Sequence, residues 1–176
     1  MDAIRLLKND HKEVEALFKE LEEISPTAKA SRKKIFERID EALTVHAKIE
    51  ETIFYPAVKA RANRDKEAKE EVLEAYEEHS NVKAMLKKLE ETEPSDETYE
   101  AKLQVLHELV KHHVKEEEHV LFPEAKGLLE KEELEALGQE LEEAKNGAAH
   151  SHNGKARRSR ATHGTIDEEA ESEVTR

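Results

Sequence analysis

Six polar residues interrupt helical seams in which the spacing otherwise places apolar side chains. They are His11, His46, Glu50, His79, His113 and Glu117. Two ionised carboxylates buried in a helical bundle would cost several kcal/mol each unless a positive charge compensated them. We therefore expect a cation to lie among these six side chains.

Two pairs among the six share one spacing. His46 and Glu50, and likewise His113 and Glu117, are four residues apart, which places both side chains of a pair on one face of a helix. Di-metal sites inside helical bundles are built from such inward-facing histidines and carboxylates. The pattern predicts two metal ions, each bound by two histidines and bridged by Glu50 and Glu117, with positions left for oxo, hydroxo or external ligands.

The ligand types narrow the choice of metal. Imidazole suits iron, copper, nickel and zinc, whereas carboxylates favour harder ions. The chain has no cysteine, so thiolate ligands, iron–sulfur clusters, disulfides and cysteine nucleophiles are excluded. Iron fits best, ahead of manganese and zinc. Two ferrous ions would bring a charge of +4 against −2 from the glutamates, which favours an oxo- or hydroxo-bridged di-iron centre.

Four stretches with apolar residues every three or four positions must hold these side chains. They lie within residues 4–21, 36–57, 72–89 and 99–120. Turn signals separate them at Ser25-Pro26, Ala62-Asn63 and Pro94-Ser95-Asp96. Because Gly and Pro are scarce and Glu, Lys, Leu and Ala abound, we expect an all-α chain folded as an up-down-up-down four-helix bundle.

The two halves of this bundle repeat each other. A shift of 68 residues places His11 on His79, and a shift of 67 residues places Glu50 on Glu117 and Pro56 on Pro123. The repeat predicts a duplicated helical hairpin with a pseudo-two-fold axis.

The composition changes after residue 145. Residues 1–145 are expected to form the bundle and a short fifth helix, which Leu134, Leu137 and Leu141 mark and Gly138 interrupts. Residues 146–176 contain no Leu, Phe or Tyr, and we expect a disordered tail.

Charge and hydropathy limit the partners. The chain carries 29 Lys and Arg against 42 Asp and Glu, a net charge of −13, which argues against a generic nucleic-acid binder. No apolar run approaches the ~20 residues that span a bilayer, and the N-terminus lacks a signal-peptide core. We expect a soluble, cytoplasmic protein without a membrane partner, and no pattern indicates its oligomeric state.

The full pattern, a His, an HxxxE, a second His and a second HxxxE, resembles the hemerythrin-like HHE cation-binding domain. The segments HAKIEETIFYP (residues 46–56) and HVKEEEHVLFP (residues 113–123) carry the resemblance, which covers about residues 1–124. It implies a non-haem di-iron four-helix bundle that meets dioxygen, peroxide or nitric oxide. Oxygen-carrying members usually have five His, one Asp and one Glu, and the second HxxxE departs from that set.

Other polar residues near the seams are expected to play lesser parts. His112 forms a competing i, i+4 pair with Glu116, and Glu116 with His119 has a ferritin-type spacing, but these residues lie off the seam and the repeat selects His113. His107 is expected at the surface. For Glu51 and Glu118 we weigh a place behind the metal ligands against an exposed position, and we favour the exposed position. Tyr55 and Tyr76 receive no assignment.

Two classes of function fit a di-iron site of this kind. The first is a redox enzyme that acts on peroxide, dioxygen or nitric oxide, and we favour peroxide detoxification under oxidative stress, a catalase-like activity. The second is non-catalytic binding, sensing or storage of oxygen, nitric oxide or iron. No catalytic residue beyond the metal site is assigned.

Overall fold

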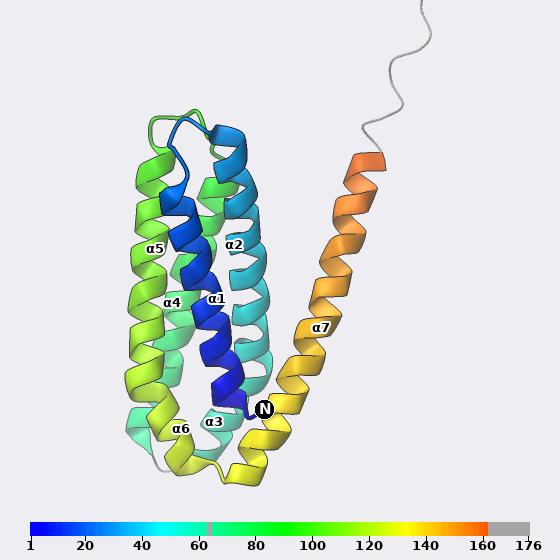
Figure 1. Cartoon of the computed structure of the whole chain (residues 1–176). Coiled ribbons are helices and arrows are strands. Elements are labelled where there is room, and N and C mark those ends of the chain that lie inside the picture. The colour runs from blue at the N-terminus through cyan, green and yellow to red at the C-terminus, as the bar shows by residue number, and fades with distance from the viewer. Residues whose placement is uncertain (63–64, 162–176) are drawn as a thin grey trace, which may run out of the picture.

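The computed structural model describes residues 1–62 and 65–161, and all regular secondary structure within them is helical (Figure 1). The elements are α1 (Ala3–Glu23), α2 (Lys29–Ile49), η1 (Glu50–Phe54), α3 (Tyr55–Arg61), α4 (Lys66–Glu90), α5 (Tyr99–Glu116), η2 (Glu117–Leu121), α6 (Phe122–Leu128) and α7 (Lys131–Ala161). Because α2, η1 and α3 follow one another without a break, as do α5, η2 and α6, the chain forms four long antiparallel helices. The predicted four-helix bundle is confirmed.

Local signals define the helix starts. The Asp2 carboxylate caps α1 by accepting a hydrogen bond from the Arg5 backbone N–H at 2.9 Å, and Asp65 caps α4 through Ala68 at 3.1 Å. In the turn before α5, Asp96 accepts a hydrogen bond from the Thr98 backbone N–H at 2.8 Å. Each cap satisfies a backbone donor that the first helical turn leaves unpaired.

The second and fourth long helices each contain one π-helical segment, a feature that the apolar spacing did not predict. η1 begins at Glu50 and η2 at Glu117, and each segment ends just before a Tyr-Pro or Phe-Pro pair. Pro56 and Pro123 have no N–H to donate, and their rings crowd the preceding turn, so a widened turn relieves both effects. Each widened turn begins at a glutamate, Glu50 in the second long helix and Glu117 in the fourth.

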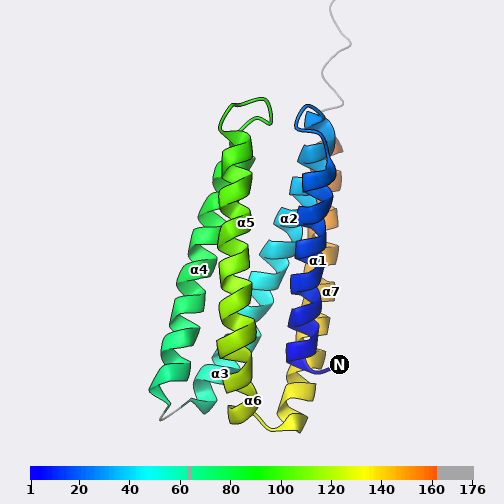
Figure 2. The same ribbon diagram turned by 60° about the vertical axis from the view of Figure 1, so that its left-hand side comes forward.

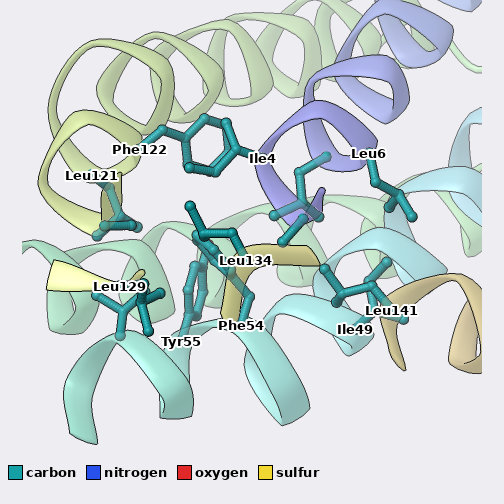
Figure 3. Close-up of a cluster of buried hydrophobic side chains, with 14 of the residues drawn as sticks. Ile4, Leu6, Ile49, Phe54, Tyr55, Leu121, Phe122, Leu129, Leu134 and Leu141 are labelled. Carbon is teal, nitrogen blue, oxygen red and sulfur yellow. The ribbon is translucent and has the colours of Figure 1, made fainter. Parts of the chain in front are cut away.

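The hydrophobic core consists of two clusters with the polar residues between them. One cluster lies towards the α1–α2 and α4–α5 turns and contains Phe18, Phe36 and Leu106. The other lies towards α3 and α6 and contains Phe54, Tyr55 and Phe122 (Figure 3). On every long helix the predicted ligand positions fall between residues of the first cluster and residues of the second. The seam therefore encloses a polar layer that apolar side chains seal on both sides.

Helix α7 lies against α1 and α2, on the side of the bundle away from α4 (Figures 1 and 2). It corresponds to the predicted fifth helix, but Gly138 does not interrupt it. A Cβ atom at Gly138 would lie 2.1 Å from the Met1 carbonyl oxygen, so this glycine lets α7 approach the start of α1 closely. Leu141, which is fully buried, fixes the same contact.

The backbone of α7 continues to Ala161, past residue 145, where the change in composition led us to expect the folded part to end. Residues 162–176 lie outside the described part, and their disorder stays a prediction. No described helix is long and apolar enough to cross a membrane.

Candidate metal centre

The six predicted ligands all lie in the polar layer, and all are buried. His11 comes from α1, His46 from α2, His79 from α4 and His113 from α5, while the two glutamates are the first residues of η1 and η2. Glu50 is 0% exposed and Glu117 is 1% exposed. The structure thus brings together all six side chains that the sequence singled out.

The imidazole rings form two pairs, one in each hairpin. The ring centroids of His11 and His46 are 4.9 Å apart and those of His79 and His113 are 4.5 Å apart, whereas rings of different pairs are 6.5 Å apart for His11 with His113 and for His46 with His79. We call the space at the His11–His46 pair the first position and that at the His79–His113 pair the second position.

Each glutamate lies between one histidine of each pair. Glu50 Oε2 is 3.1 Å from His46 Nε2 and 3.3 Å from His79 Nε2. Glu117 Oε2 is 3.2 Å from His11 Nε2 and 3.5 Å from His113 Nε2. Both carboxylates therefore have the placement of groups that bridge the two positions.

The donor atoms also meet the spacing that a metal site requires. One ligand atom each from His11, His46, Glu50 and Glu117 lie within 4.8 Å of one another, and so do atoms of Glu50, His79 and His113. Four buried atoms in this layer have no hydrogen-bond partner among the described residues. They are His11 Nε2, His46 Nε2, Glu50 Oε1 and Glu117 Oε2. Buried polar atoms without a partner are costly in free energy. A bound cation would supply the partner that these four atoms lack.

A second layer of carboxylates holds the outer nitrogens of the rings. His11 Nδ1 is 3.0 Å from Glu118, His79 Nδ1 is 2.9 Å from Glu51, and His113 Nδ1 is 2.9 Å from Glu78. His46 Nδ1 faces Asp10 at 3.7 Å. An Nδ1–H that points at a carboxylate leaves the Nε2 lone pair directed inwards, which is the tautomer a metal ligand needs.

These four carboxylates follow the repeat. Asp10 and Glu78 each precede a seam histidine and serve the histidine of the next helix, whereas Glu51 and Glu118 each follow a seam glutamate and serve a histidine of the other hairpin. For Glu51 and Glu118 the sequence favours an exposed position over a place behind the metal ligands. They are partly exposed, but their oxygens turn inwards, and the signal that would have found them was their place in the repeat.

The comparison with known families agrees with this geometry. The Hemerythrin HHE cation binding domain matches residues 2–125. The chain belongs to this family. The HHE domain therefore covers the four long helices and stops before α7.

Two similar proteins add to this comparison. A crystal structure of a Hemerythrin HHE cation binding domain-containing protein from Mycobacterium kansasii has a TM-score of 0.77 and 25% identity, covering 89% of this chain and 93% of that one. A DNA nickase from Nostoc sp. is 30% identical over 145 residues, which are 82% of this chain. The chain spans 38% of the length of that nickase.

Two tyrosines form hydrogen bonds beside the six side chains of the HHE centre. Tyr55, which is fully buried, donates a hydrogen bond to Glu117 Oε1 at 2.7 Å, and its hydroxyl is 3.3 Å from Glu50 Oε2. Burial raises the pKa of Tyr55 well above its usual value, and the charges of Glu117 and Glu50 raise it further, so the hydroxyl keeps its proton. Tyr76 donates to the Glu51 backbone carbonyl at 3.0 Å.

The pKa values of His46 and Glu50 depart strongly from their usual values. Burial disfavours a charged His46, but the carboxylates of Glu50, Asp10 and Glu117 outweigh it and raise the pKa of His46 to about 10. Burial alone would raise the pKa of Glu50, yet His46 and His79 hold it well below its usual value. A cation that enters the site must therefore displace protons.

The competing histidines lie outside both groups of metal-ligand donors. His112 is largely exposed, and its Nε2 is 3.1 Å from Glu78 Oε1. The His119 ring donates to the Lys115 backbone carbonyl at 2.8 Å. His107 is largely buried, contrary to expectation, because its ring stacks on Phe18 with a centroid distance of 4.2 Å.

Proposed function

We propose that the HHE domain binds two iron ions, one at each position, with His11, His46, His79 and His113 as nitrogen ligands and Glu50 and Glu117 as shared carboxylates. The four buried ligand atoms without a hydrogen-bond partner support this proposal most directly. The nitrogen and oxygen donor set and the absence of cysteine also favour iron, ahead of manganese and zinc.

We further propose that the iron-loaded protein decomposes peroxide. Two redox-active ions at adjacent positions supply the two electrons that pass between one peroxide molecule and the next. In the balanced reaction, two molecules of hydrogen peroxide give two of water and one of dioxygen. The buried Tyr55 hydroxyl, which keeps its proton, offers a hydrogen-bond donor beside the shared carboxylates.

A groove in the surface supplies an access route for a small substrate. It has a volume of about 650 Å³, lies between α1 and α5, and includes His11 and its partner Glu118 in its lining. Ala16, Val110 and Val114 provide apolar lining beside them. An apolar surround limits the access of water to a metal site while small neutral molecules can still pass.

The test is peroxide turnover by the iron-loaded full chain, followed as oxygen evolution. We expect many turnovers per site, and we expect His46→Ala to abolish them while His107→Ala, a change to a buried histidine outside the site, retains them. In a second arm, the reduced protein is exposed to oxygen and then degassed. A spectrum that cycles with oxygen and no peroxide turnover would overturn the enzyme and favour reversible gas binding or sensing. Iron uptake far above two ions per chain would favour storage.

We propose in addition that nucleic acid is not a partner of this chain, although the Nostoc relative is named a DNA nickase. The net charge of −13 opposes binding to a polyanion. Incubation of the iron-loaded chain with supercoiled plasmid checks this, and the appearance of nicked circles above the metal-free control would contradict it.

A further inference from the structure

Helix α7 lies outside the family's matched residues, yet one of its side chains pairs with a carboxylate beside the candidate metal centre. Lys145, on α7, places its Nζ 2.6 Å from Asp10 Oδ1, and its side chain is half-buried. Asp10 itself is 6% exposed. This is an ion pair at the edge of the core, and it joins α7 to the residue next to His11.

The other oxygen of Asp10 serves His46. Asp10 Oδ2 is 3.7 Å from His46 Nδ1, and neither atom has a hydrogen-bond partner among the described residues. Because Lys145 engages Oδ1, the carboxylate is held in the orientation that turns Oδ2 towards the ring. Among the described residues, Lys145 is the cation that pairs with Oδ1, so its removal would leave that oxygen of a buried carboxylate without its positive partner.

A similar arrangement of ring, carboxylate and outer partner occurs at the other histidines. Lys8 pairs with Glu118 at 3.0 Å, Lys83 donates to Glu51 at 2.7 Å, and the His112 ring lies 3.1 Å from Glu78. Those three outer partners are all within the HHE domain. Among the four histidines, His46 is the one whose carboxylate is paired with a residue of α7.

The arrangement of the helices places the contact with α7 beside the first position. α7 packs on α1 and α2, which carry the histidines of the first position, and it lies on the side of the bundle away from α4 (Figures 1 and 2). Gly138 and Leu141 fix the height of α7 along α1, and Lys145 follows Leu141 by one helical turn.

We propose that α7 is a working part of the metal centre and that Lys145 is a positioning residue for His46, so that α7 controls how tightly the first position holds its ion. This inference rests on the proposed two-ion site, but not on the proposed reaction with peroxide. α7 thus makes the two positions unequal: the ion at the first position depends on a helix that the family domain does not include.

The experiment measures release of iron from the full chain. The protein is loaded with two equivalents of iron(II) without oxygen, and an excess of a chromophoric chelator is added. Lys145→Met, which keeps the apolar stem and removes the charge, is compared with Lys145→Arg. Lys131→Met is the control, because Lys131 is on the same helix, is highly exposed and pairs only with Glu135 in the described part of the chain. Mössbauer spectra of the iron-57 protein report the two environments separately.

We expect Lys145→Met to speed the release of one ion by about 10- to 100-fold, the usual effect of losing an outer partner of a metal ligand. The other ion should change by less than about twofold, one of the two quadrupole doublets should shift, and Lys145→Arg should restore the rate. Lys83→Met, which removes the cation behind Glu51 and His79, should speed the other phase instead.

Equal acceleration of both ions in Lys145→Met, or no change in either, would overturn the inference, as would failure of Lys145→Arg to rescue. The proposed function fails in a different way. A protein that holds two ions, responds to Lys145→Met as expected and does not consume peroxide would retain this inference and lose the enzyme.

Discussion

The first hairpin, α1 to α3, and the second, α4 to α6, hold the same types of proposed ligand in different surroundings. Both contribute two histidines, a glutamate that starts a π-helical segment, and a proline after it. At the position where the first hairpin has Tyr55, the second has Phe122, whose ring stacks on His11 with a centroid distance of 5.7 Å. In the described part of the chain, α7 packs mainly against the first hairpin. The proposed ligand set is thus duplicated while its environment is not, and the two positions should differ in chemistry.

The largest effect should come from removing a ligand from either half. His46→Ala and His113→Ala should each lose bound metal and lower the stability of the protein by about 3–5 kcal/mol, because a buried glutamate is left without its partner. Metal content and thermal unfolding check this. His107→Ala should keep its metal and lose only packing against Phe18. Loss of iron in His112→Ala but not in His113→Ala would contradict the ligand assignment.

Metal removal should make stability depend on pH. The pKa of His46 is raised to about 10 in the folded metal-free chain, against ~6.5 when unfolded. This group therefore contributes stability that is fully present below pH ~6.5 and is lost as pH rises towards 10. Glu50, whose pKa is lowered, contributes in the opposite sense and is lost at acid pH.

Thermal unfolding between pH 7 and 10, with and without iron, measures this dependence. We expect the midpoint of the metal-free protein to fall across this range, while the iron-loaded protein, in which His46 is neutral, falls much less. A metal-free midpoint that stays constant to pH 10 would show that His46 is not charged at neutral pH.

Replacing the tyrosine that distinguishes the halves should have a smaller effect. Tyr55→Phe makes the first hairpin like the second and leaves Glu117 Oε1 without its 2.7 Å hydrogen bond, which should cost about 1–3 kcal/mol. Two iron-loaded Mössbauer doublets should move closer together. Phe122→Tyr is the reciprocal variant, and doublets that move closer together in neither variant would mean that the asymmetry at this position has no consequence.

Two shortened chains that differ by one residue test the role of Lys145. A chain that ends at Lys145 should keep both ions and its helicity, since residues 146–176 hold no ligand position. A chain that ends at Ala144 differs by one residue and should release the ion of the first position faster. Chelator release from the two chains measures the difference, and identical kinetics would remove Lys145 from the account.

Sequence alone was sufficient for the bundle and for all six inward-facing positions. Apolar spacing marks a seam, and a His or Glu at a seam position is a visible exception, as Glu50 is. The duplication then separates His113 from His112, because only His113 has the same distance to a proline as His46 has. These inferences succeed because they depend on contacts within one helix or on a repeat.

The sequence predicts the outer layer of carboxylates only in part, because this layer depends on contacts between helices: Glu51 and Glu118 stand out as candidates, and Asp10 and Glu78 do not. Asp10 and Glu51 occupy positions next to seam residues, where a charged side chain ordinarily faces water, and only the rotation of the helices turns them to His46 and His79. Lys145 pairs with a residue 135 positions away. The π-helical segments were also missed, since a proline predicts a local break and does not say how the helix will absorb it.

The measurement that tests the central claim most directly is an anaerobic titration of the metal-free full chain with iron(II), with bound iron determined after desalting. The account predicts two ions per chain, bound with unequal affinities because the surroundings of the two positions differ. A plateau at one ion, or no retained iron at all, would contradict a two-position centre built from both hairpins.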